Sequence, residues 1–286
     1  MNFQQIKNLV KTHFLAGHNP DFIIIGAQKC GTTSLHYYLS QHPKLKGSRP
    51  KEIHYFDKWI NYDYQLKWYK NHFNIMSFKK TLFFESSPNY IYYEEIARLI
   101  KEYFPGIKLI LMLRNPVDRA YSAWNMYREM YERNKPDFSK RGGRFPGAPN
   151  YIYEYLMKGR SIFPGFSDVI QIEQELMSLE NAPQEPAILR RGLYVDQIKD
   201  YLKYFDRENL HIIGFKDFAT NTEKVLRSVY HFLEIPDYPF SDLNNEPKGK
   251  REYQKKMNQE TQDYLNEFYK AKNLELFELL KFEPNW

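Results

Sequence analysis

Cysteine is almost absent from the sequence, because the chain of 286 residues contains only Cys30. A single thiol excludes an intramolecular disulfide and any zinc site built from cysteines. This scarcity also favours a reducing compartment. No apolar run approaches the ~18 residues of a membrane span, and the polar N-terminal stretch lacks the apolar core of a signal peptide. These absences predict a cytoplasmic protein without a membrane span.

Positive charge is in modest excess, since 41 Lys and Arg stand against 35 Asp and Glu, a formal net charge of +6. Such a balance favours an anionic partner without identifying it. Nucleic acid, a membrane surface, an anionic glycan and a doubly phosphorylated nucleotide all fit. Apolar residues are abundant, at 42% hydrophobic and 17% aromatic. That content excludes intrinsic disorder and allows a sizeable core.

Short apolar runs alternate with helical patterns along the chain. The runs at 22–25, 82–84, 107–113 and 210–215 predict buried strands. Helical patterns follow these runs. One begins after Gly31, one ends at Tyr103, one begins at Pro116, one spans 193–205, one begins at 222 and one spans 259–281. Strands alternating with helices predict an α/β fold with a mostly parallel central sheet and helices on both faces.

The chain shows no repeat, low-complexity tract or clean linker, which predicts a single domain over 1–286. Between 134 and 190 the periodicity weakens, and prolines and the RGGR run at 141–144 occur. We expect this segment to be a partly irregular insertion on the acceptor side of the active face.

A glycine-rich loop joins the first predicted strand to the first predicted helix, with the sequence GAQKCGTTS over 26–34. A loop there presents successive backbone N–H groups, and the helix N-terminus adds partial positive charge. The spacing of Gly26 and Gly31 matches a Walker A loop, but Lys29 lies inside the loop and Thr32 follows the second glycine. The strand at 107–113 also ends without a magnesium-binding aspartate. The loop therefore predicts a P-loop-like phosphate site that differs from that of a nucleoside triphosphatase.

This loop resembles the 5′-phosphosulfate loop of sulfotransferases that use 3′-phosphoadenosine-5′-phosphosulfate (PAPS). The stretch LMLRNPVDRAYS over 111–122 is similar to the 3′-phosphate motif of the same superfamily. The resemblance implies PAPS as co-substrate and 3′,5′-ADP (PAP) as product, with no metal required. It assigns the phosphosulfate to Gln28, Lys29, Cys30, Gly31, Thr32, Thr33 and Ser34. It assigns the 3′-phosphate to Arg114 and Ser122, and a guanidinium fork at a strand end suits that group.

Three further stretches resemble the heparan sulfate 3-O- and N-sulfotransferases. They are KEIHYFD over 51–57, RGLY over 191–194 and KGKRE over 248–252. The resemblance implies that Tyr194 contributes to the nucleotide site. It also implies that a loop containing Lys248, Gly249, Lys250 and Arg251 closes over the nucleotide.

The sequence departs from this group in two places. The group's Glu-Lys-Thr/Ser-Pro motif is ESSP here, so Ser86 stands where the active-site lysine is expected. The disulfide hairpin before the closing loop is also absent, because the chain has no second cysteine. The acceptor therefore need not be heparan sulfate.

For catalysis, the resemblance implies Glu52 as general base and Lys29 as the cation on the leaving phosphate. His54 is the alternative base, since its ordinary pKa suits proton transfer. The sulfuryl group would pass to a hydroxyl group, or to an amine, of the acceptor. A glycan acceptor, the leading hypothesis, would use Arg141, Arg144 and the tyrosines of 150–155. A small hydroxylated metabolite, lipid or polyketide is the alternative acceptor. The resemblance implies no nucleic-acid partner.

Two further classes remain open. A non-catalytic nucleotide- or polyanion-binding module would keep the loop but give Glu52 no role. A small-molecule kinase is disfavoured by the displaced lysine and the missing metal ligand.

Overall fold

The computed structural model describes residues 17–62, 64–73, 81–138, 144, 148–243 and 256–286. Lys248, Gly249, Lys250 and Arg251, predicted to close over the nucleotide, lie outside these residues, as does Arg141. No helix in the described part of the chain is both long and apolar enough to cross a bilayer.

Five parallel strands form the central sheet in the order β2-β3-β1-β4-β5. Their bounds are β1 Phe22–Gly26, β2 Leu45–Gly47, β3 Leu82–Ser86, β4 Lys108–Leu113 and β5 Leu210–Gly214. β1 and β4 are completely or almost completely buried, which explains why they read as continuous apolar runs. The predicted α/β fold is confirmed.

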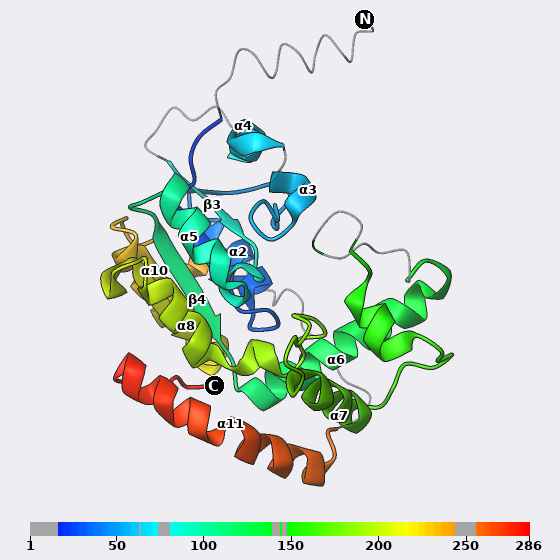
Figure 1. Ribbon diagram of the computed structural model, residues 1–286. Coiled ribbons are helices and arrows are strands. Elements are labelled where there is room, and N and C mark those ends of the chain that lie inside the picture. Colours follow the sequence, from blue (N-terminus) through cyan, green and yellow to red (C-terminus); the bar gives the residue numbers. More distant parts are fainter. Residues whose placement is uncertain (1–16, 63, 74–80, 139–143, 145–147, 244–255) are drawn as a thin grey trace, which may run out of the picture.

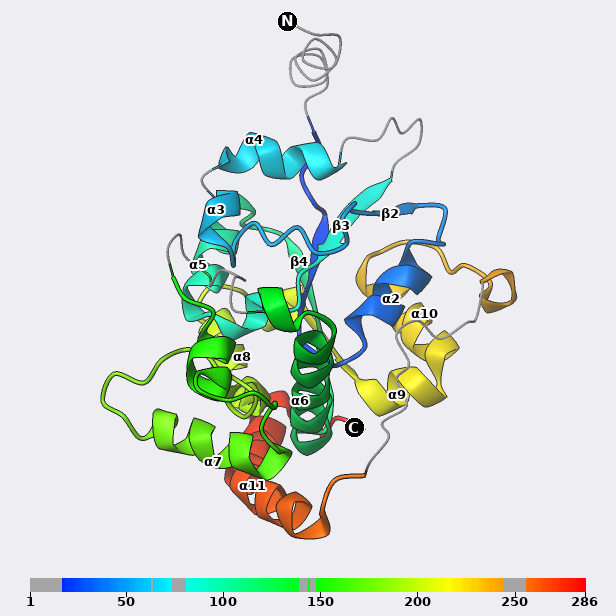
Figure 2. The same cartoon turned by 90° about the vertical axis from the view of Figure 1, so that its right-hand side faces the viewer.

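Helices cover both faces of the sheet (Figure 1, Figure 2). One face carries α2 (Thr32–Leu39), α9 (Phe215–Thr220) and α10 (Thr222–Phe232). The other carries α5 (Glu94–Tyr103) and α8 (Tyr194–Leu202), with α11 (Gln259–Leu280) packed outside α8. Two short helices, α3 (Trp59–Tyr62) and α4 (Gln65–Lys70), follow the segment that contains Glu52.

The segment predicted to be irregular contains more helix than its sequence suggested. After α6 (Pro116–Arg133), a π-helical turn spans Tyr153–Met157 and α7 spans Phe166–Met177. These elements share a second hydrophobic cluster with α6 and α11. The buried carboxylate of Glu173 on α7 accepts the backbone N–H groups of Ile188, Leu189 and Arg190 at 2.7, 2.9 and 3.0 Å. This cluster of bonds anchors the approach to α8.

The order of the strands determines where the ligand-binding crevice of the sheet lies. β1 lies in the middle of the sheet, and the helix that follows it, α2, covers the face opposite to α8. Connections from neighbouring parallel strands that leave to opposite faces open a crevice at the strands' carboxyl ends, where ligands bind in α/β folds. The turns after β1 and β4 both border that crevice.

Candidate active site

The turn after β1 is fixed to the neighbouring strand and ends in an uncapped helix. Ala27 donates its N–H to the Met112 carbonyl of β4 at 2.9 Å, and Cys30 donates to Ala27 at 3.2 Å. Among the described residues, no side chain caps the N-terminus of α2. Because the first-turn N–H groups of a helix have no intrahelical partner, those of Thr32 and Thr33 can bind an anion.

Two residues of this loop have left-handed backbone conformations, Lys29 with φ of 69° and Gly31 with φ of 90°. At Gly31 the space is also restricted, because an added Cβ would lie 3.0 Å from the Phe215 ring. Both constraints require glycine here. The sequence predicted the glycine, but its contact with Phe215 depends on the fold.

Arg114, at the end of β4, lies against the same loop. Its Nη1 donates to the Lys29 carbonyl at 3.5 Å, and its guanidinium lies 4.9 Å from the centre of the Phe215 ring. Its Nε is buried without a hydrogen-bond partner among the described residues. A buried guanidinium nitrogen in this state suits a bound anion. The structure therefore brings the two predicted phosphate-binding turns together.

The N-terminus of α6 is already occupied, in contrast to that of α2. The Asn115 side chain accepts from the N–H groups of Val117 and Asp118 at 3.0 and 3.3 Å. An anion beside Arg114 therefore depends on the guanidinium more than on this helix end.

Tyr194 and Cys30 lie beneath the two turns and connect them. The Tyr194 hydroxyl donates to the Arg114 carbonyl at 2.9 Å and lies 3.6 Å from the Cys30 Sγ. Both side chains are buried, and burial raises the pKa of the Cys30 thiol. This environment makes the thiol a packing group rather than a nucleophile. Direct contact of either side chain with the nucleotide stays a prediction.

Ser122 is buried on α6, one helical turn after Arg119. Arg119 points into the core and donates to the Ile188 carbonyl. The contact of Ser122 with a 3′-phosphate also stays a prediction.

Glu52 is held at both carboxylate oxygens. Lys51 Nζ lies 2.7 Å from Oε1, and His54 Nε2 lies 3.2 Å from Oε2. Burial alone would raise the pKa of Glu52, but hydrogen bonds from His54 and Lys51 outweigh it and lower the pKa to about 2. The carboxylate is therefore ionised at neutral pH.

The other imidazole nitrogen of His54 lies 2.8 Å from Asp57 Oδ2, and Asn89 donates to the same oxygen at 2.9 Å. Burial would lower the pKa of His54, but its bonds to Asp57 and Glu52 raise it to about 9. A protonated imidazole has no lone pair to accept a proton, which disfavours His54 as the base. The geometry makes it a partner that orients Glu52.

A buried carboxylate that the sequence did not single out supports this segment. Glu85 accepts hydrogen bonds from Tyr69, Ser87 and Tyr90 at 2.6, 2.7 and 3.0 Å. Ser87 in turn accepts the backbone N–H of His54 at 3.2 Å. His54 has a left-handed φ of 55°, so this anchor fixes a backbone conformation that costs free energy.

Lys51 is a site residue that the sequence did not single out, beyond its place in the KEIHYFD stretch. Its Nζ lies 3.5 Å from the Thr32 hydroxyl, at the start of α2, as well as beside Glu52. Its carbonyl accepts the Ser86 N–H at 3.1 Å. Ser86 itself, where a lysine was expected, hydrogen-bonds His36 Nδ1 at 2.7 Å. Lys51 therefore places a cation between the phosphate loop and the candidate base.

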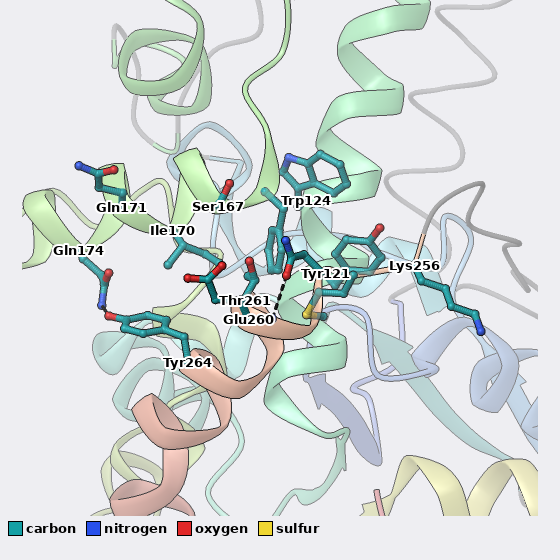
Figure 3. A pocket seen from close by; sticks show the side chains of 13 residues that line it. Tyr121, Trp124, Ser167, Ile170, Gln171, Gln174, Lys256, Glu260, Thr261 and Tyr264 are labelled. Atoms are coloured by element: carbon teal, nitrogen blue, oxygen red, sulfur yellow. Dashed lines mark hydrogen bonds between the residues drawn. The ribbon is translucent and has the colours of Figure 1, made fainter.

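Two pockets lie near these elements. The first, of about 260 Å³, is bordered by the loop residue Gln28 and by Asp57. The second, of about 560 Å³, is a groove between α6, α7 and α11, with aromatic walls that include Tyr121, Trp124 and Tyr264 (Figure 3). Among the described residues, neither the phosphate loop nor Glu52 lines the second groove. Glu52 does not line the first pocket either, but that pocket includes Asp57, which bonds the His54 that contacts Glu52.

A parallel α/β sheet with two adjoining turns suited to phosphate groups is typical of nucleotide-binding proteins. Comparison with known proteins narrows the class. A sulfotransferase-domain family model matches residues 19–277. The chain therefore belongs to the sulfotransferase family, whose members use PAPS, and the predicted resemblance is confirmed.

Individual relatives agree with this assignment. The chain is 26% identical to the membrane-associated sulfotransferase kil1 of Dictyostelium discoideum, over 93% of this chain and 66% of that protein. It is 29% identical to the human bifunctional heparan sulfate N-deacetylase/N-sulfotransferase 2, over 91% of this chain and 29% of that enzyme. It thus spans only part of the length of both relatives.

Among solved structures, a sulfotransferase from Alicyclobacillus acidocaldarius has a similar fold. The TM-score is 0.67 at 25% identity, covering 93% of this chain and 97% of the other.

Proposed function

We propose that this protein transfers the sulfuryl group of PAPS to a hydroxyl group of a glycan, with Glu52 as general base. The observation that carries the proposal is the position of the Lys51 ammonium, which contacts both the Glu52 carboxylate and Thr32 of the phosphate loop. A donor in that loop would lie next to the group that deprotonates the acceptor, as an in-line displacement requires.

The two turns would bind the two ends of the nucleotide. The uncapped N-terminus of α2 and Lys29 suit the 5′-phosphosulfate. Arg114, whose buried Nε has no partner within the described part of the chain, suits the 3′-phosphate.

In the transfer step, the acceptor oxygen attacks sulfur while the bond between sulfur and the bridging oxygen of PAPS breaks. The acceptor proton passes to Glu52, and PAP leaves with the bonding electron pair. Charge spreads over the sulfuryl oxygens in such a transition state, where Lys29 and Lys51 stabilise it.

Lys51 and His54 have a second effect on Glu52. Their hydrogen bonds keep the carboxylate ionised but lower its pKa to about 2, which weakens it as a base. Because a carboxylate has about four lone-pair sites and these contacts use two, the acceptor hydroxyl would donate to a remaining one, and the proton would move along that hydrogen bond.

The glycan acceptor is supported by the heparan sulfate N-sulfotransferases among the relatives.

A general base within reach of a hydroxyl contributes about 10²–10⁴ in rate, so Glu52→Gln should lose activity by that order. The matched control is Glu94→Gln, because Glu94 is exposed on α5 and pairs with Lys203.

The test uses radiolabelled PAPS with a panel of glycans, phenols and alcohols, in the presence of a chelator. Labelled acceptor that disappears in Glu52→Gln, while PAP binding persists, supports the proposal. PAP binding without labelling of any acceptor would instead indicate a non-catalytic module. Labelling that needs ATP and magnesium would indicate a kinase.

A further inference from the structure

The pocket that contains Gln28 and Asp57, here called the Tyr93 pocket, is small and has polar and aromatic walls. Its volume is about 260 Å³, slightly below the usual range of small-molecule sites, which begins at about 300 Å³. It is lined by Gln28, Asp57, Lys58, Asn89, Tyr93, Tyr127, Arg144, Asn150, Tyr151, Ile152, Pro183, Gln184, Glu185 and Arg191. This size suits one sugar-sized ring rather than an extended chain.

The Tyr93 pocket is connected to the transfer site on two sides. Gln28 directly precedes Lys29 in the phosphate loop. Asp57 bonds His54, which holds Glu52 at 3.2 Å. A ring in the pocket would therefore lie on the acceptor side of the donor, with one hydroxyl directed toward Glu52.

Both arginines of the pocket, Arg191 and the partly exposed Arg144, are already paired with carboxylates. Arg191 lies 2.5 Å from Glu185, and Arg144 lies 2.5 Å from Glu95. Arg144 also stacks on Tyr93, with 3.9 Å between the guanidinium and the ring centre. An arginine paired in this way offers little to a second anion, and an added carboxylate would face Glu185 and Asp57 in the same pocket.

The pocket still has unused hydrogen-bonding capacity of both kinds. Within the described residues, Gln28 Oε1 and Glu185 Oε2 are buried acceptors without a partner, and Arg191 Nε is a buried donor without one. A hydroxyl group both donates and accepts, whereas a carboxylate or a sulfate only accepts. Tyr93, Tyr127 and Tyr151 add aromatic surface for the apolar face of a ring.

From these contacts we infer that the Tyr93 pocket binds an uncharged, hydroxyl-rich ring, a neutral sugar residue or cyclitol, as the acceptor unit. The inference rests on the proposed sulfotransferase function and specifies its substrate class. It separates this chain from enzymes whose acceptor units carry carboxylates, because both arginines of the pocket are already paired and Lys58, its remaining cation, is exposed to solvent.

The test compares methyl glucoside with methyl glucuronide, two probes with the same ring that differ by one carboxylate. Binding is measured by saturation-transfer NMR and titration on the full chain saturated with PAP. We expect the neutral glycoside to bind about tenfold more tightly. A preference for the glucuronide, or no binding of either probe, would overturn the inference.

Replacing Glu185 should shift the preference of the pocket from the neutral glucoside toward the glucuronide. Glu185→Gln removes the partner of Arg191, so the glucuronide should gain affinity relative to the glucoside. Tyr151→Ala should weaken both probes and disturbs no ion pair of the pocket, so it tests the site even where Glu185→Gln folds poorly. Glu94→Gln should leave both affinities unchanged. Unaltered selectivity in folded Glu185→Gln would contradict the inference.

A titration with PAP, made before the sugar-binding experiments, distinguishes failure of the proposed function from failure of the inference about the acceptor. Absence of PAP binding contradicts the proposed function and the inference with it. PAP binding together with glucuronide preference contradicts the inference alone.

Discussion

At the scale of single residues, Lys51 is the contact that joins donor and acceptor chemistry. It lies 2.7 Å from Glu52 and 3.5 Å from Thr32, while Ser86 occupies the position where a lysine was expected and bonds His36. The pairing of Lys51 with Glu52 could be anticipated from their adjacency. Its contact with Thr32 could not, because it depends on how the segment after β2 folds against α2.

Replacing Lys51 tests this role. Lys51→Met should lower kcat by about 10²–10³, the usual effect of losing one stabilising donor in a transition state, with a smaller effect on PAP affinity. Lys46→Met is the control, because Lys46 is an exposed lysine of β2. Steady-state kinetics with PAPS and a turned-over acceptor measure both. Equal activity in the two variants would exclude Lys51 from the transfer step.

The Glu52–His54 pair gives folding stability a defined pH dependence. The pKa of Glu52 falls from 4.5 to about 2 on folding, so its contribution is present above pH 4.5 and is lost as pH falls toward 2. The pKa of His54 rises from 6.5 to about 9, so its contribution is complete below pH 6.5 and is lost as pH rises toward 9. The pair is therefore most stabilising between pH 4.5 and 6.5.

Thermal melts of wild type and His54→Gln at a series of pH values measure this dependence. The Tm advantage of the wild type should be greatest near pH 6 and shrink between pH 6.5 and 9. An advantage that stays constant over this range would show that His54 is not held protonated.

At the scale of elements, the phosphate loop is a turn whose conformation only glycine suits. Gly31 combines a φ of 90° with a Cβ position 3.0 Å from Phe215. Gly31→Ala should therefore destabilise the protein by about 1–2 kcal/mol and weaken PAP binding. Gly106→Ala is the control, because nothing lies within 4 Å of its Cβ position. Comparable urea denaturation curves for both variants would contradict the strain at Gly31.

The elements that the sequence revealed are those with strong local patterns. The buried runs of β1 and β4 and the proline at the start of α6 were predicted within a residue or two. β2, with three residues, is too short to produce a pattern. α7 was missed because the prolines and glycines around it suggested loop. Its anchor, Glu173, bonds backbone groups at 188–190, a contact that no local pattern encodes.

At the scale of the whole molecule, the sheet order brings distant segments into one crevice. The turns after β1 and β4 could be predicted to approach each other, because carboxyl ends of parallel strands meet at one edge. The Tyr93 pocket could not, since it combines Gln28, Asp57 and residues from 144 to 191. Arg144, expected to contact a glycan acceptor, lines this pocket but is paired with Glu95, and only the folded chain shows that pairing.

The central claim is that the two turns bind one nucleotide at both its 5′- and its 3′-phosphate group. Calorimetry with PAP and 5′-AMP tests this claim most directly. Losing a charged hydrogen-bond partner costs about 1.5–3 kcal/mol, or about 10- to 100-fold in affinity. Wild type should therefore bind PAP at least tenfold more tightly than 5′-AMP. Arg114→Ala should lose that difference, and Arg133→Ala, exposed at the far end of α6, should keep it. Equal affinities of the wild type for the two nucleotides would contradict the account.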